Sequence, residues 1–152
     1  MLKNIPALLG PDFLKILRAM GHGDEIAIVD ANYPADAHAQ RLVRADGHGA
    51  VEILDAVLTV MPLDHAADAA FRPCAYGDCA RIEPIYEEFA AIIAQHDRDA
   101  TLRPLSGEAF YDRVRSSYAV AASGERRLYG NIILRKGVIP APDMLSESGD
   151  IS

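Results

Sequence analysis

Short apolar runs alternate with amphipathic helical segments along this chain of 152 residues. Apolar runs predict strands at 26–29, 41–43, 71–76, 118–122 and 129–135. Apolar residues at helical spacing predict helices at 11–20, 50–59, 84–96 and 107–115, with Ser106 as a cap and Gly21 as a left-handed end of the first helix. Strands alternating with helices indicate one layered α/β domain with a largely parallel mixed sheet flanked by helices.

Composition excludes several classes of partner. Fifteen Lys and Arg against 22 Asp and Glu give a net charge of −7. Nucleic acids and anionic membranes need clustered cations, so neither is expected to bind. The amino terminus reads MLKNIPALLG, which is too short an apolar stretch for a signal peptide or a membrane span. We therefore expect a cytoplasmic protein.

The two ends of the chain differ in character. Residues 1–139 show no repeat or shift in composition, and we expect them to form the single domain. Residues 140–152 are rich in Pro, Ser and acidic residues, which predicts a flexible tail.

Cys74 and Cys79 are the only cysteines. Their spacing does not fit a zinc knuckle, and no second pair exists to complete such a site. We expect reduced thiols, with a local disulfide or a redox role as the alternatives.

His22 lies between two glycines, after the first predicted helix and before the first predicted strand. Imidazole is the side chain best suited to move protons near neutral pH, and glycines let a ligand approach the backbone. The alternative is a turn in which His22 is incidental. A metal site made of His22, Asp24 and Asp30 lacks compact ligand spacing, so we expect no metal.

Polar residues also stand at the ends of predicted strands. Asp30 follows the apolar run 26–29, where α/β proteins present side chains to ligands, although a turn leading into Pro34 would also explain it. Tyr129, Gly130 and Asn131 combine an aromatic ring, a close backbone approach and an amide, which suits a polyhydroxylated ligand. An ordinary turn would use the same residues.

Several of these segments together resemble the RbsD/FucU family, the ribose-pyranase and fucose-mutarotase proteins. The resemblance is carried, in order and spacing, by 20–26, 29–31, Pro34, 44–47, 109–111, 123–125, 129–134 and 136–138. Gly-His-Gly-Asp-Glu, Arg-Ala-Asp-Gly and Tyr-Gly-Asn make it closer to the fucose-mutarotase branch than to the ribose branch.

The resemblance implies a three-layer α/β fold and ring assemblies, commonly two stacked pentamers, with sugar sites at subunit contacts. It implies a monosaccharide substrate and no metal or organic cofactor. His22 would transfer protons, and the sugar would be bound by Asp30, Tyr111, Tyr129, Gly130 and Asn131. The corresponding hypothesis is a mutarotase of L-fucose or a related aldose, in which Asp30 orients both the sugar and the imidazole.

One departure from the family pattern bears on activity. The family usually places a basic residue before the Ala-Phe-Tyr segment, whereas this chain has Gly107. Arg103 or an arginine of another subunit is a candidate replacement for the missing positive charge. Gly107 favours the alternative of a sugar-binding or regulatory protein without catalysis. A third hypothesis is an isomerase acting on a different small carbonyl or hemiacetal substrate.

Overall fold

The structure, a computed structural model, describes residues 1–147 and shows a six-stranded sheet in the order β2-β5-β1-β6-β3-β4. Its strands are β1 Glu25–Val29, β2 Leu42–Ala45, β3 Ala70–Pro73, β4 Leu102–Leu105, β5 Ala119–Ser123 and β6 Ile132–Arg135. Strand β6 runs antiparallel to both its neighbours, and the other pairings are parallel. The predicted mixed, largely parallel sheet is confirmed.

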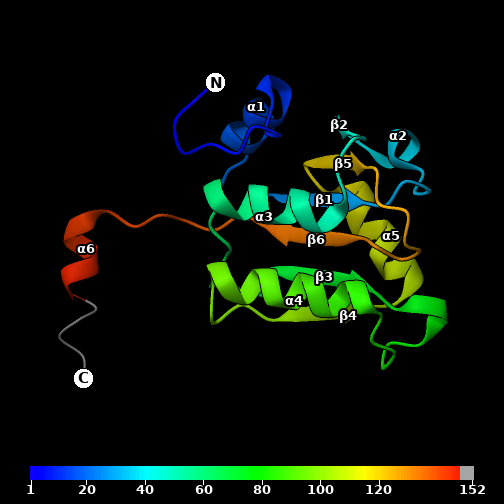
Figure 1. The fold of residues 1–152 in the computed structure, drawn as a ribbon. Coiled ribbons are helices and arrows are strands. Elements are labelled where there is room, and N and C mark those ends of the chain that lie inside the picture. Colours follow the sequence, from blue (N-terminus) through cyan, green and yellow to red (C-terminus); the bar gives the residue numbers. More distant parts are fainter. Residues whose placement is uncertain (148–152) are drawn as a thin grey trace.

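Helices cover both faces of this sheet (Figure 1). They are α1 Pro11–Ala19, α2 Ala35–His38, α3 Ala50–Val60, α4 Pro84–His96 and α5 Gly107–Ser116, with a short 3-10 turn η1 at Ala75–Gly77 and α6 at Pro142–Glu147. Helices α1, α3 and α4 pack on one face of the sheet, and α2 and α5 pack on the other. The domain therefore has three layers.

Alternating side chains of the central strand build both cores. In β1, Ile26 and Ile28 face the α3 and α4 layer, whereas Ala27 and Val29 face α5. All four are fully buried, which is why this strand reads as a continuous apolar run. Because β6 is antiparallel, its first residue lies at the same edge as the last residues of the other strands. We call this the carboxyl edge, and it lies on the right of Figure 1.

Some local predictions were wrong. The first helix ends at Met20 in extended conformation, so Gly21 is not a left-handed cap. Ser106 occupies the cap position of α5 but makes no capping hydrogen bond with its side chain. The expected strands at 71–76 and 129–135 are shorter, at Ala70–Pro73 and Ile132–Arg135, and the omitted parts contain Tyr76 and Tyr129, whose φ angles are positive. Helix α2 and edge strand β4 were not predicted.

The two cysteines form a disulfide bond between Cys74 and Cys79, which corrects the expectation of reduced thiols. The bond closes a short loop around η1. The alternative of a local disulfide is the one that the structure shows.

The carboxyl-terminal segment extends away from the sheet layers and carries α6 (Figure 1). This helix lies within the segment predicted to be flexible, whose residues 148–152 are outside the described residues. In residues 1–147, no helix is both long and apolar enough to cross a membrane.

Candidate functional site

Four of the predicted sugar-binding residues meet at the carboxyl edge. Asp30 follows β1, and Asn131 immediately precedes the neighbouring strand β6. The backbone N–H of Asp30 donates to Oδ1 of Asn131 at 2.6 Å, and both residues are buried. Tyr129 and Gly130 lead into Asn131. Strand pairing therefore brings together residues that are about a hundred positions apart in sequence.

The Asp30 carboxylate lies in an unusual environment. Its Oδ1 accepts the N–H of Asn32 at 2.9 Å, while no Lys, Arg or His among the described residues forms an ion pair with it. Burial raises the pKa of Asp30, and the nearby charge of Glu125 adds to this effect. A buried carboxylate without a cation has unused capacity to accept hydrogen bonds, which sugar hydroxyls can fill.

Gly130 is required by packing. A Cβ at this position would lie 2.9 Å from side-chain atoms of Glu125 and Ile85, and 3.0 Å from the carbonyl oxygen of Arg127. Tyr129 has a φ of 59°, and its carbonyl accepts a hydrogen bond from Tyr86 Oη at 3.1 Å. Packing at Gly130 and the hydrogen bond from Tyr86 therefore hold this turn in one conformation.

Two residues that the sequence did not single out brace the end of β1. Ser123 Oγ donates to the carbonyl of Val29 at 2.6 Å and accepts the N–H of Glu125 at 3.1 Å. The Glu125 carbonyl then accepts the N–H of Ala31 at 2.8 Å. The Ser-Gly-Glu segment was part of the family resemblance, which was the signal that could have identified both.

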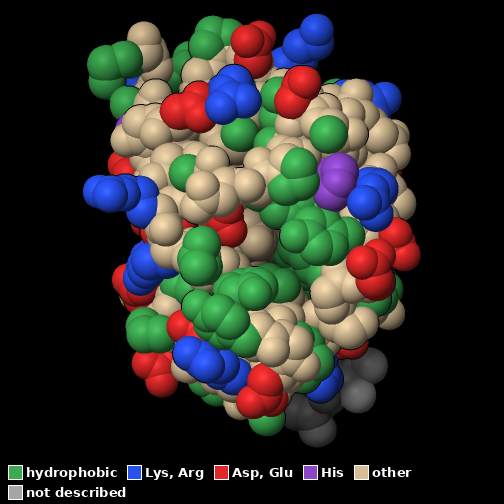
Figure 2. All heavy atoms as spheres, turned by 90° about the vertical axis from the view of Figure 1, so that its right-hand side faces the viewer, with side chains coloured by type: hydrophobic (Ala, Val, Ile, Leu, Met, Phe, Trp, Pro, Cys, Tyr) green, Lys and Arg blue, Asp and Glu red, His purple; other side chains and the backbone are tan. Residues whose placement is uncertain are grey.

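Tyr111 approaches the same edge from α5. Its ring stacks on Tyr33 with centroids 5.5 Å apart and meets the edge of His38 at 5.5 Å. Tyr33 in turn donates its backbone N–H to the Asp30 carbonyl at 3.2 Å. Figure 2 faces this edge and shows hydrophobic side chains around a hollow in which acidic groups are visible.

His22 lies at the opposite edge of the sheet. Its turn precedes β1 and is held to the end of the neighbouring strand β6, because the N–H of Gly23 donates to the carbonyl of Lys136 at 2.9 Å. The His22 side chain is 48% exposed, and its Nε2 lies 3.0 Å from Oδ1 of Asp64. The imidazole is thus both oriented and accessible.

Asp64 was missed by the sequence analysis, since it stands 42 positions from His22 in an unremarkable segment. It is buried and accepts the N–H of Ala66 at 3.0 Å and Nε–H of Arg135 at 2.7 Å. These two hydrogen bonds, together with His22, hold the pKa of Asp64 far below its ordinary value. The contact with this carboxylate fixes the orientation of the His22 ring.

Strand β1 separates the two groups. Its five residues span about 16 Å at roughly 3.3 Å per residue, and His22 precedes it while Asp30 follows it. The hypothesis that Asp30 orients the imidazole therefore does not hold within one chain. For the same reason, His22, Asp24 and Asp30 of one chain do not form a metal site. Within residues 1–147, the group close enough to hold a metal is His65, Asp97 and Asp99.

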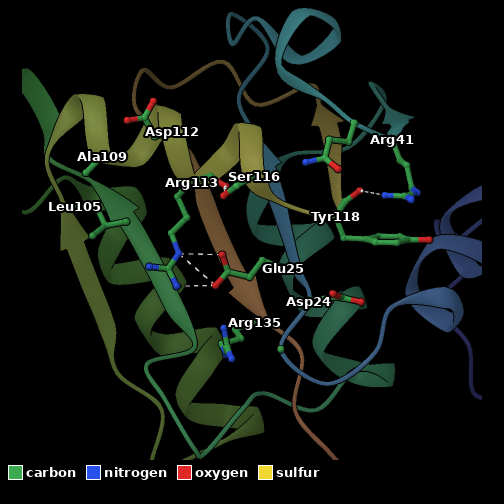
Figure 3. A pocket seen from close by; sticks show the side chains of 12 residues that line it. Asp24, Glu25, Arg41, Leu105, Ala109, Asp112, Arg113, Ser116, Tyr118 and Arg135 are labelled. Atoms are coloured by element: carbon green, nitrogen blue, oxygen red, sulfur yellow. Dashed lines mark hydrogen bonds and ion pairs between the residues drawn. The ribbon is translucent and has the colours of Figure 1, made fainter.

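An open depression of about 720 Å³ adjoins the turn of His22 on the α5 side (Figure 3). Gly23 and Arg135 contribute to its lining. Inside it, Arg113 pairs with Glu25 at 2.7 Å and stacks over the ring of Phe71 at 3.7 Å. This arrangement satisfies the charge of Arg113, so its role there is structural.

The position of Gly107 is open. A Cβ on this residue would meet nothing within 4 Å, so a longer side chain would fit at the start of α5. Within its own chain Arg103 does not replace the missing charge, because it pairs with Asp68 at 3.5 Å and lines a depression that also contains Asp64.

Comparison with known proteins finds relatives over nearly the whole chain. The model of the RbsD / FucU transport protein family matches residues 3–139. The fucose mutarotase of Homo sapiens is 40% identical over 151 residues, covering 95% of this chain and 98% of the relative. The L-fucose mutarotase of Actinobacillus pleuropneumoniae is 38% identical over 144 residues, covering 92% and 99%. The crystal structure of the fucose mutarotase from Streptococcus pneumoniae in complex with L-fucose has a TM-score of 0.85 and 44% identity, covering 91% of this chain and all of the other.

Proposed function

Because the chain belongs to the RbsD/FucU family, as its sequence resemblance predicted, we propose that it is a mutarotase that interconverts the α and β anomers of L-fucose or a related aldose. The observation that carries this proposal is the buried Asp30 carboxylate, which lies beside Asn131 and has no cationic partner among the described residues. The relatives named fucose mutarotase, at 38–40% identity over most of the chain, support the same substrate class.

In this proposal the sugar binds at the carboxyl edge. Asp30 accepts hydrogen bonds from neighbouring hydroxyl groups, and Asn131 donates and accepts. Tyr111 and Tyr129 add aromatic surface with polar tips. Gly130 keeps the turn closely packed, as its contacts with Glu125 and Ile85 require. Holding the hydroxyls in place lowers the entropic cost of the reaction.

His22 then comes from a second copy of the chain. Since His22 and Asp30 lie at opposite edges of one sheet, a complete site needs the amino edge of one copy to meet the carboxyl edge of another. Such a head-to-tail contact uses two different surfaces and closes into a ring when the rotation permits. This geometry supports a head-to-tail ring, whereas the number of five subunits and the stacking into a decamer rest on the family resemblance alone.

The chemistry is an exchange of protons with no net change in atoms. His22 takes the proton from the anomeric hydroxyl while the bond between the anomeric carbon and the ring oxygen breaks, and the imidazolium of His22 then gives that proton to the ring oxygen. The open aldehyde rotates about its adjacent bond, and the reverse steps close the other anomer. Asp64 holds the imidazole and stabilises the imidazolium that forms.

Gly107 favours a second candidate, a sugar-binding or regulatory protein of the same fold without catalysis. The position carries no basic side chain, and Arg103 is paired elsewhere. A cytoplasmic location stays a prediction in either case.

The test is NMR saturation transfer between anomers of L-fucose, D-ribose and related aldoses, with and without protein. Faster exchange for one sugar supports the mutarotase. Saturable line broadening, with anomer exchange at its spontaneous rate, would contradict the mutarotase and support a sugar-binding protein without catalysis.

A further inference from the structure

Two residues with strained backbone touch each other at the carboxyl edge. In the described chain, three non-glycine residues have a positive φ, and two of them are Tyr76, at 55°, and Tyr129, at 59°. Their ring centroids lie 4.8 Å apart in an edge-on contact. A bulky residue is strained in this region, and such residues gather at ligand sites.

Tyr76 is also exposed to an unusual degree for a large aromatic residue. It is 59% exposed, although it stands beside the buried end of β3. The guanidinium of Arg81 lies over its ring at 4.6 Å, which steadies the ring without covering it. An ordered and exposed aromatic ring is a binding feature rather than a core feature.

The loop that carries Tyr76 is fixed from two sides. The disulfide between Cys74 and Cys79 joins its ends. Beneath it, the buried Arg72 donates one hydrogen bond to the Pro73 carbonyl at 3.0 Å and another to the Cys79 carbonyl at 3.1 Å. The position of Tyr76 is therefore set by the fold and not by the ring alone.

The same buried group connects this loop to the turn of Tyr129. The Arg72 guanidinium lies 4.6 Å from the ring centroid of Tyr86, and Tyr86 Oη donates to the Tyr129 carbonyl at 3.1 Å. No carboxylate in residues 1–147 forms an ion pair with Arg72. Tyr76 and Tyr129 thus form one rigid aromatic pair, which leads directly to Asn131 and Asp30.

We propose that Tyr76 is a sugar-binding, specificity-determining residue, whose ring covers a nonpolar C–H face of the sugar while Asp30 and Asn131 hold its hydroxyls. A pyranose presents C–H groups on its faces and hydroxyls around its rim, so an aromatic wall beside a carboxylate matches both parts. This inference rests on the proposed binding of a sugar at the carboxyl edge.

The experiment compares Tyr76→Ala and Tyr76→Phe with the unmodified protein, using the concentration of sugar that half-saturates anomer exchange or NMR binding. Tyr76→Ala raises this concentration about three- to tenfold with a nearly unchanged maximal rate, because an aromatic contact is lost in the ground state and the transition state alike. Tyr76→Phe keeps the ring and stays within about twofold. Ile82→Ala, which removes another exposed apolar side chain from the same segment, serves as the control and changes nothing.

The possible failures are distinguishable. A protein that binds a sugar without speeding its anomer exchange overturns the mutarotase alone, and the binding titration still tests Tyr76. Unchanged affinity in Tyr76→Ala overturns the role of Tyr76 alone. A change in subunit number on sedimentation, without a change in affinity, overturns it as well and makes the ring an interface residue. Absence of binding to every sugar overturns both.

Discussion

Asp30 and Asp64 are both buried aspartates, but they lie at opposite edges of the sheet and in opposite electrostatic environments. Asp64 is paired with Arg135 and His22, and its pKa is held far below the ordinary value. Within residues 1–147, the partners of Asp30 are amide and backbone groups, and burial raises its pKa. The charge at the amino edge is thus satisfied within the fold, whereas the charge at the carboxyl edge is left for a ligand.

The largest expected effect is on catalysis at the amino edge. His22→Ala lowers the rate of anomer exchange by about 10²–10⁴-fold, because it removes the proton-transfer group. Sugar affinity, measured by NMR titration, changes little, since Asp30 and Asn131 remain. Full activity in His22→Ala would refute the assignment of His22.

Replacing Asp64 or Asp30 by asparagine is expected to change the free energy of unfolding differently, because the two aspartates lie in different environments. Asp64→Asn lowers the free energy of unfolding by about 2–3 kcal/mol, because an amide has one acceptor oxygen in place of two. It cannot accept hydrogen bonds from Arg135 and His22 on separate oxygens, and its NH2 group faces one of these donors. Asp30→Asn keeps an oxygen for the Asn32 N–H and leaves stability at pH 7 unchanged or slightly higher, while sugar affinity falls. Urea unfolding at pH 7 measures both, and equal losses would contradict the comparison.

The same pair predicts opposite pH dependences of the unfolding free energy. The depressed pKa of Asp64 contributes stability above about pH 4, which is lost as the pH falls toward the folded pKa. The raised pKa of Asp30 contributes stability below about pH 4, which is lost as the pH rises through the folded pKa. The free energy of unfolding should therefore depend less steeply on pH in each asparagine variant than in the unmodified protein. For Asp64→Asn the slope decreases below about pH 4, and for Asp30→Asn it decreases above about pH 4. If a variant showed the same pH dependence as the unmodified protein in its pH range, the pKa shift of the replaced aspartate would be absent.

The disulfide loop is expected to contribute less. Replacing both cysteines, in Cys74→Ser/Cys79→Ser, lowers the free energy of unfolding by about 2 kcal/mol, because a short loop is closed in the unfolded chain. A reducing agent has the same effect on the unmodified protein and none on the double variant. If reductant destabilised both equally, the bond would not be the cause.

The smallest effect compares two glycines near the carboxyl edge. Gly130→Ala costs about 1–2 kcal/mol, because its Cβ would lie 2.9 Å from Glu125 and Ile85. Gly107→Ala meets nothing within 4 Å and is neutral or slightly stabilising in α5. Thermal unfolding of the two variants decides this, and a neutral Gly130→Ala would contradict the packing.

The sequence was most informative where local patterns decide structure. Apolar periodicity located α4 at both ends, and an acidic residue after a buried run identified Asp30. It could not pair His22 with Asp64, because the contact depends on how distant segments meet across the sheet. The positive φ of Tyr76 and Tyr129 was likewise invisible, since residue types that rarely adopt it gave no signal. The spacing of the cysteines did not decide between free thiols and a disulfide. Reduced thiols were expected because disulfides are rare in cytoplasmic proteins, and that expectation was wrong.

The most direct test of the account is complementation between copies. At a sugar concentration well below half-saturation, the His22→Ala protein exchanges anomers slowly because it lacks the proton-transfer group, and the Asp30→Asn protein does so because it binds the sugar weakly. The two proteins are dissociated, mixed in equal amounts and reassembled, with mixed assemblies verified by native mass spectrometry. In a head-to-tail ring, about a quarter of the contacts then join an intact His22 to an intact Asp30. We expect anomer exchange to recover to roughly that fraction of the unmodified rate. Mixed assemblies as inactive as the single variants would contradict a site shared between the two edges.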